Sequence, residues 1–179
     1  MAASKTQSLI ISAIGDDKPG LVEHLSELVM ETGCSILDSR MASLGGEFAI
    51  IMLVHGPWNA LAKLEQKLPD AEQRLSLTLA IKRTDKPEPG GNLLPYAVEV
   101  VALDQPGIVY HLANFFASRG INISEVATTS YAAPHTSTPM FAANLHVHIP
   151  ADMKVANIRE EFMLFCDGMN LDAVIEPAK

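Results

Sequence analysis

The feature of this sequence that most constrains its fold is an internal repeat. Seven residues within positions 17 to 33 recur as the same residue types 87 positions further along the chain. The matched pairs are Asp17 and Asp104, Pro19 and Pro106, Gly20 and Gly107, Val22 and Val109, His24 and His111, Leu25 and Leu112, and Gly33 and Gly120. Seven ungapped matches in so short a window indicate two copies of one structural unit.

Each copy has the hydrophobic pattern of six elements. A short apolar run, at 8–14 in the first copy, predicts a buried strand, and apolar residues spaced three to four apart then predict a helix with Pro at its first position. Two strands follow, joined by Gly45-Gly46 in the first copy and by a longer loop in the second. A second helix and a last strand complete each copy, at Asn59–Leu68 and Leu75–Ile81, and at Met153–Phe165 and Leu171–Ile175. The order βαββαβ, twice, predicts an α+β fold of two ferredoxin-like domains in tandem, with antiparallel sheets and helices on one face.

The two predicted domains are separated by a segment rich in Pro, Gly and charge. This segment, TDKPEPGGN, predicts a linker at residues 84–92. We therefore expect a first domain at 1–83 and a second at 93–179.

The charge balance argues against two kinds of partner. Thirteen Lys and Arg against 21 Asp and Glu give a net charge of −8, so neither direct nucleic-acid binding nor adhesion to an anionic membrane is expected. No apolar run approaches the roughly 20 residues that span a bilayer, and we expect a soluble, cytoplasmic protein. Cys34 and Cys166 are far apart and lack CxxC spacing, which favours buried free thiols over a disulfide or a zinc site.

The turn before each first helix is the best candidate for a binding site. A helix N-terminus offers unpaired N–H groups to a carboxylate, and Gly20 or Gly107 lets a ligand approach the backbone. The nearby Asp17 and Asp104 could accept hydrogen bonds from an ammonium group, and an α-amino acid carries both groups. The alternative is structural: these aspartates cap the helices, and Pro-Gly merely forms the turn.

Histidines are the competing signal. His146 and His148 share one face of a strand and His135 precedes them, so a metal site or a general base can be imagined. Without a third ligand at recognisable spacing, packing of a strand face is the simpler interpretation. No catalytic motif occurs in its required context, so we expect no enzyme activity, no cofactor and no metal.

The duplicated βαββαβ pattern with this turn resembles the ACT domain, a small module that binds amino acids or other metabolites where two such domains pair. The resemblance implies effector-binding residues in the first turn and at the start of the second strand of each copy. At these positions the chain has Asp16, Asp17, Gly20, Leu21 and Ser35, and then Asp104, Gln105, Gly107, Ile108 and Asn122. The copies differ, because Gly-Ile-Asn-Ile at 120–123 follows the family pattern whereas Gly-Cys-Ser-Ile at 33–36 replaces the amide with a hydroxyl.

The second half is similar to the glycine cleavage system transcriptional repressor family. The similarity lies in APHTSTPMF at 133–141, IPA at 149–151 and REEFMLFCDGMNLDAVIEP at 159–177. It implies a regulator linked to glycine metabolism that acts by binding a separate DNA-binding activator. Two alternatives stay open: a regulatory amino-acid-binding module for a metabolic enzyme, or a His-based metal protein or enzyme.

Two further expectations concern partners. We predict that the loop Tyr131–Pro139, with Pro134, His135 and Thr136, binds a protein partner, because the first copy closes the same hairpin with two glycines. A lid over a ligand site or a neutral insertion would explain the same loop. Exposed sheet edges are usually covered in native proteins, so we expect the copies to pair and the chain to form a homodimer.

Overall fold

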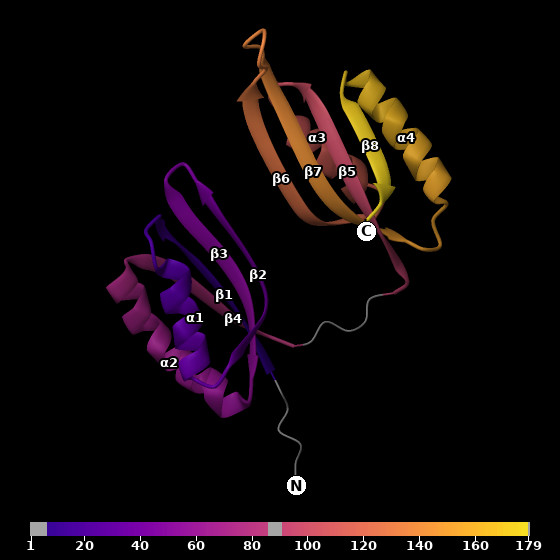
Figure 1. The fold of residues 1–179 in the computed structure, drawn as a ribbon. Coiled ribbons are helices and arrows are strands. Elements are labelled where there is room, and N and C mark those ends of the chain that lie inside the picture. The colour runs from indigo at the N-terminus through magenta and orange to yellow at the C-terminus, as the bar shows by residue number, and fades with distance from the viewer. Residues whose placement is uncertain (1–6, 86–90, 179) are drawn as a thin grey trace. The chain divides into compact units, whose positions relative to one another are not determined.

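Each copy of the repeat folds into a four-stranded antiparallel sheet with two helices on one face (Figure 1), which confirms the predicted fold class. The computed structural model describes residues 7–85 and 91–178 and divides the chain into two compact units, Met1–Glu88 and Pro89–Lys179. Most of the predicted linker, residues 86–90, lies outside the described residues. The domain boundaries therefore stay predictions.

The N-terminal unit contains six elements in the order βαββαβ. They are β1 (Gln7–Asp16), α1 (Leu21–Glu31), β2 (Ser35–Leu44), β3 (Glu47–Gly56), α2 (Trp58–Leu75) and β4 (Leu77–Thr84). The strands lie in the order β2-β3-β1-β4, so β2 and β4 are the edges of this sheet.

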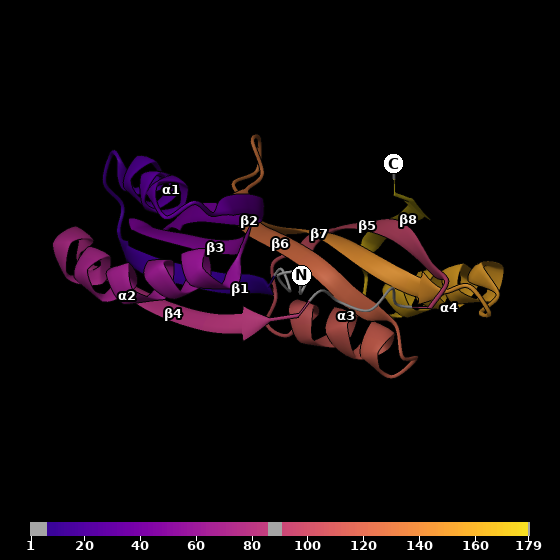
Figure 2. The same cartoon turned by 90° about the horizontal axis from the view of Figure 1, so that it is seen from below.

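The C-terminal unit repeats this order. Its elements are β5 (Leu93–Leu103), α3 (Ile108–Ala117), β6 (Asn122–Ala132), β7 (Pro139–Pro150), α4 (Val155–Gly168) and β8 (Asp172–Pro177). The strand order is β6-β7-β5-β8, and both helices lie on one face of the sheet (Figure 2). The edge strands β6 and β8 correspond to β2 and β4.

Alternation along the two central strands of each sheet builds the core. In β1 and β3, every second residue is buried against the helices, and Leu9, Ile11 and Val54 are fully enclosed. Strands β5 and β7 alternate in the same way. The helices of the C-terminal unit add a cluster of four aromatic rings, with centroids 5.0 to 5.3 Å apart for most pairs, from Phe115, Phe116, Phe162 and Phe165. Each unit thus has its own hydrophobic core.

Helix α2 is longer than we predicted. The prediction ended it at Leu68, but the helix continues through Pro69 to Leu75. Proline cannot donate the backbone hydrogen bond of that turn, which normally favours a helix end. Here the apolar face goes on beyond it, with Ala71 buried and Leu75 packed on the core, and the contacts of these side chains offset that loss. The last strand accordingly begins at Leu77 and not at Leu75.

An ion pair joins α2 to the edge strand β4. The Arg83 guanidinium donates to both carboxylate oxygens of Glu65, at 2.9 and 2.7 Å, and lies over the Trp58 ring. Its third donor reaches the side-chain oxygen of Gln7 at 2.9 Å. The hydrogen bonds from Arg83 hold the pKa of Glu65 below its ordinary value.

We predict that Glu65→Gln destabilises the protein at neutral pH and has little effect in acid. Because the folded-state pKa lies below the ordinary value of 4.5, the stabilisation is complete above that pH and is lost as the pH falls through the lowered pKa. Urea unfolding near pH 7 and near pH 3 would measure the change, with the exposed Glu27→Gln on α1 as the control. Equal midpoints for Glu65→Gln and wild type at pH 7 would contradict the prediction.

Candidate functional site

The repeated glycine begins the first helix of each unit in a left-handed conformation. Gly20 is the N-cap of α1 with φ 91°, and Gly107 is the N-cap of α3 with φ 92°. Each helix thus starts after the glycine, and Pro19 and Pro106 precede the cap instead of occupying the first helical position that we predicted. Glycine is needed at this point because L side chains are disfavoured at positive φ.

The repeated histidine lies beside the repeated glycine. The Gly20 carbonyl accepts the His24 backbone N–H at 2.9 Å and lies 2.7 Å from Nδ1 of the His24 ring. In the second unit the His111 backbone N–H donates to the Gly107 carbonyl at 3.0 Å, and a Cβ at Gly107 would lie 3.5 Å from the His111 ring. Both histidines thus lie at the turn, one helical turn after the repeated glycine.

The aspartates of the turns do not cap the helices. Neither α1 nor α3, whose N-caps are Gly20 and Gly107, has a side-chain hydrogen bond at its N-cap. The capping role is therefore not seen, while the other part of that alternative, that Pro-Gly merely forms the turn, stays open. Asp17 accepts a hydrogen bond from the Ser43 hydroxyl, and its backbone N–H donates to the Gly46 carbonyl at 3.1 Å. Asp104 donates its backbone N–H to Pro139 at 2.9 Å. In both units, the turn is thereby tied to the hairpin that joins the second and third strands.

The structure places the remaining turn residues beside these groups. Asp16 ends β1 and pairs with Lys18 at 3.2 Å on the surface. Gln105 is exposed, and Leu21 and Ile108 are the first residues of their helices, with buried side chains. These two positions can therefore offer backbone groups to a ligand, while their side chains belong to the core.

The predicted effector residues fall into two groups at opposite ends of each sheet. Ser35 pairs with His55, which pairs with Ser8 near the start of β1, whereas Asp16 pairs with Glu47 at the far end. Eight residues of strand separate the two ends, about 26 Å at the usual rise. Asn122 and Leu103 stand in the same relation in the C-terminal unit. Within one unit, the turn before the first helix and the start of the second strand therefore lie far apart.

The strands that begin at Ser35 and Asn122 are exposed edges. Every residue of β2 is exposed, and so is nearly all of β6. Each strand has a β-bulge at its third residue. In β2 it lies between Ile36 and Asp38, and in β6 it lies between Ile123 and Glu125. The bulges lie at equivalent positions in the two copies, and no residue type at Leu37 or Ser124 would have revealed them.

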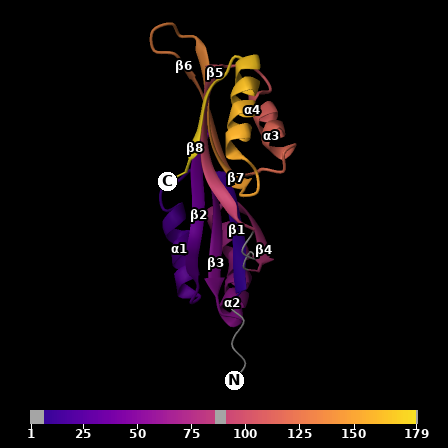
Figure 3. The ribbon, with the colours of Figure 1, turned by 90° about the vertical axis from the view of Figure 1, so that its right-hand side faces the viewer.

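The loop that we assigned to a partner is an ordered turn at the tip of the β6–β7 hairpin. The Ala133 backbone N–H donates to Thr138 at 2.9 Å, and the Ser137 N–H donates to Ala133 at 2.9 Å. Pro134, His135 and Thr136 are exposed. The loop that joins β6 to β7 lies beyond the end of the sheet (Figure 3). The base of the loop adjoins the Gly107 turn through the Asp104 to Pro139 hydrogen bond.

His146 and His148 lie on the helix-free face of the second sheet, as the alternation predicts. His146 Nδ1 is 3.5 Å from a carboxylate oxygen of Glu125 on the neighbouring strand. Among residues 7–85 and 91–178, no three His, Cys, Asp or Glu side chains are grouped so that they could hold a metal ion. Cys34 and Cys166 are buried free thiols, and burial raises the pKa of Cys166 to about 12.

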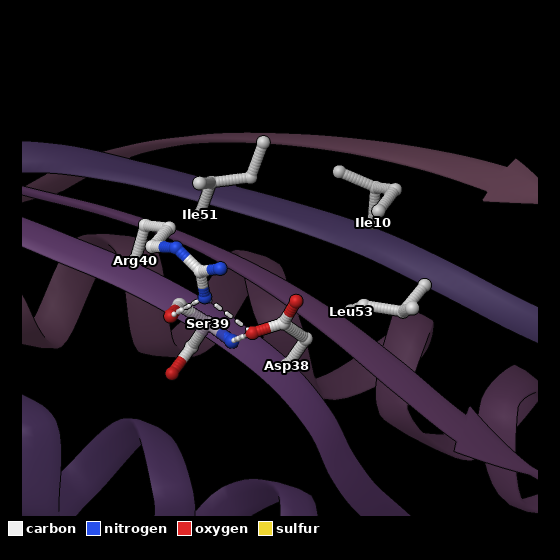
Figure 4. Close-up of a pocket in the computed structure, with 6 residues that line it drawn as sticks. All are labelled: Ile10, Asp38, Ser39, Arg40, Ile51 and Leu53. Atoms are coloured by element: carbon white, nitrogen blue, oxygen red, sulfur yellow. Dashed lines mark hydrogen bonds and ion pairs between the residues drawn. The ribbon is translucent and has the colours of Figure 1, made fainter. Parts of the chain in front are cut away.

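A shallow pocket that the sequence interpretation missed lies on the helix-free face of the N-terminal sheet. Figure 4 shows its lining, the aliphatic side chains Ile10, Ile51 and Leu53 beside the polar Asp38, Ser39 and Arg40. Asp38 and Arg40 form an ion pair there. None of the predicted effector residues lines this pocket. Its aliphatic residues alternate with core residues along β1 and β3, which is the signal that could have identified it.

Comparison with known proteins identifies the family. The ACT domain family model matches residues 7–82. The chain is 33% identical over 178 residues to the glycine cleavage system transcriptional repressor of Escherichia coli (strain K12), which covers 98% of this chain and 92% of the relative. This chain belongs to the glycine cleavage system transcriptional repressor family. The relative from Shigella flexneri has the same identity and coverage.

Solved structures agree with this family assignment over the whole tandem. A crystal structure provisionally named as a glycine cleavage system transcriptional repressor is 27% identical, with a TM-score of 0.74, and covers 97% of this chain and 98% of that one. A crystal structure of an unknown protein from Galdieria sulphuraria, 25% identical, has a TM-score of 0.78 and covers 97% and 99%. In the part of the chain that the structure describes, no helix is long and apolar enough to cross a membrane.

We predict that Gly107→Ala destabilises the C-terminal unit by about 1–2 kcal/mol, the cost of placing an L residue in a left-handed conformation. The space around the new Cβ is not the cause, because the nearest atom would be 3.5 Å away. Gly168→Ala is the matched control, since a Cβ there meets nothing within 4 Å and its φ is ordinary. Urea unfolding of both variants would measure the difference, and equal stabilities would contradict the prediction. Because of the same strain, Gly107→Val would not be a neutral probe of ligand approach to this turn.

Proposed function

We propose that this chain is a non-enzymatic regulatory protein that binds a small amino acid and acts through a protein partner on transcription of the glycine cleavage genes. The observation that carries the proposal is the duplicated turn, which presents an uncapped helix N-terminus beside a carboxylate in both units. The names of its relatives, which describe repressors of the glycine cleavage system, supply the biological context. Glycine is the first ligand to test.

The chemistry of the turn suits a zwitterion. The first N–H groups of α1 and α3 receive no side-chain cap, so they are able to donate to a carboxylate and the helix dipole favours that charge. Asp16, Asp17 and Asp104 offer oxygen acceptors for the ammonium group. A ligand without a large side chain suits a turn whose glycine is packed against a histidine ring.

Pairing of two sheets would complete the site. Within one unit, Ser35 or Asn122 is about 26 Å from the turn. If an exposed edge strand pairs antiparallel with the edge of another such sheet, the start of one strand meets the hairpin end of the other, where the glycine turn lies. Two half-sites from different sheets would then face one ligand, with Asn122 contributing an amide and Ser35 a hydroxyl. We propose this pairing together with a homodimer.

The partner that we propose is a DNA-binding activator. The net charge of −8 disfavours direct binding of this chain to DNA, so control of transcription requires another protein that makes those contacts. The loop with Pro134, His135 and Thr136 is exposed and ordered, and it adjoins the Gly107 turn. Occupation of the turn by an amino acid could thus alter the surface that the partner meets.

We predict that isothermal titration calorimetry detects binding of glycine or another small amino acid to the full chain. Asn122→Ala should weaken this affinity about tenfold or more, because a hydrogen bond to a charged group contributes about 1.5–3 kcal/mol. Asn157→Ala, on the exposed side of α4, is the control and should leave affinity unchanged. Absence of heat with all the common amino acids on correctly folded protein would overturn the proposed effector class.

We predict that replacing Ala133 to Ser137 with a Gly-Asn turn leaves folding and amino-acid affinity nearly unchanged and reduces capture of a transcriptional activator. The first unit closes the equivalent hairpin with Gly45-Gly46, so the sheet does not need the longer loop. Pull-down with the purified full chain would measure the loss. Undiminished capture would contradict the partner role, and lost ligand affinity would support the lid interpretation instead.

A further inference from the structure

Two of the six histidines occupy equivalent positions that the sequence repeat does not reveal. In the first sheet, His55 of β3 pairs directly with Ser35, the first residue of β2. In the second sheet, His148 of β7 pairs directly with Asn122, the first residue of β6. Ser35 and Asn122 are 87 positions apart, as in the repeat, whereas His55 and His148 are 93 positions apart because the second hairpin is longer. The structure thus aligns a histidine with the strand start of both units.

Both histidines lie on the helix-free side of their sheets. The residues just before them, Val54 and Val147, are fully buried in the two cores, and neighbouring residues of a strand point to opposite sides. Directly paired residues of adjacent antiparallel strands share a side, with Cβ atoms about 5 Å apart. Each imidazole therefore lies beside the polar side chain, hydroxyl or amide, at the start of the edge strand.

These two rings differ from the other histidines in burial and in the availability of their nitrogen atoms. His55 and His148 are partly buried, whereas the other four histidines are exposed. His24 Nδ1 lies against a backbone carbonyl, and His146 Nδ1 lies against a carboxylate. Within residues 7–85 and 91–178, the rings of His55 and His148 have no hydrogen-bond or ion-pair partner. Their nitrogen atoms are therefore available to a ligand.

The row of side chains around each histidine favours an anionic ligand group. Across the first sheet, the row contains Thr84, Ser8, His55 and Ser35, and in the second sheet it contains Pro95, His148 and Asn122. Neither row contains Asp or Glu, and hydroxyl, amide and imidazole groups can all donate hydrogen bonds. A carboxylate has about four acceptor sites, so donors at a strand start can add to those of a helix N-terminus.

We propose that His55 and His148 are effector-contacting residues, each donating a ring N–H to the carboxylate of the bound amino acid beside Ser35 or Asn122. This inference rests on the proposed function and adds a histidine to the strand half of each of its sites. The carboxylate is then held from two sides. The N–H groups of a helix N-terminus in one sheet lie on one side, and the imidazole with its neighbouring hydroxyl or amide in the paired sheet lies on the other. The ammonium group is left to the aspartates of the turn.

Substitutions of His148 separate hydrogen bonding from shape in the full chain. His148→Phe keeps a planar ring without a donor and should weaken amino-acid affinity about tenfold or more, because it removes a hydrogen bond to a charged group. His148→Gln keeps an N–H donor and should stay within about threefold of wild type. His146→Phe, two residues away on the same side of the same strand, is the matched control and should leave affinity unchanged.

Isothermal titration calorimetry would measure these affinities. The probe is glycine or, if wild type does not bind glycine, the common amino acid that wild type binds most tightly. Combining His55→Phe with His148→Phe should weaken binding at every site that wild type shows. Analytical ultracentrifugation and circular dichroism should give the wild-type oligomeric state and fold for all of these variants.

Three results would overturn the role of the histidines while amino-acid binding stands. Unchanged affinity in the doubly substituted protein would exclude both contacts. Equal losses in His148→Gln and His148→Phe would show that an N–H donor is not what binds the amino acid. A change of oligomeric state together with the loss of affinity would assign the histidines to the pairing of sheets instead. Absence of binding of every common amino acid to wild type would overturn the proposed function itself, and this inference with it.

Discussion

Each unit depends on burying one face of a four-stranded sheet beneath two helices. Two helices cover only one face of the sheet. The other face and the edge strand, β2 or β6, therefore remain exposed. In β1, for example, Leu9 and Ile11 are fully enclosed while Ile14, on the opposite face, is half exposed. The edge strands left uncovered by this arrangement are the ones on which the proposed pairing takes place.

Much of the fold could be predicted because its signals are local and occur twice. The repeat around Gly20 and Gly107, together with the alternation of apolar residues, predicted element order and sheet type. Boundaries were less accurate where tertiary packing opposed a local preference. The second helix was predicted to end at Leu68, yet the chain remains helical through Pro69 to Leu75 because Ala71 and Leu75 pack on the core. The helix propensities of single residues do not include the energy of these core contacts, which offsets the cost of a proline inside the helix.

The candidate site was predictable in its parts but not in its assembly. Gly20 and Ser35 are only 15 positions apart in the sequence, and the first helix lies between them. That helix returns the chain along the sheet, so the two residues end at opposite ends of it. The structure also reassigns side chains by contact: Asp17 binds the Ser43 hydroxyl instead of a helix terminus, and His24 lies at the turn. The role of Asp17 depends on a residue 26 positions away in the sequence, whereas His24 contacts a carbonyl only four positions away.

The matched bulges of β2 and β6 also bear on how the tandem arose. One extra residue, Leu37 in one strand and Ser124 in the other, interrupts the pairing at the same place in both copies. Two independent insertions at one position are less economical than a single insertion that preceded the duplication. A single unit that already had this irregular edge would account for both bulges. Since a bulge reverses which side of the sheet the preceding residues occupy, losing it would turn Ser35 or Asn122 to the other side. The bulge thus fixes the side of the sheet on which these two side chains lie in both copies.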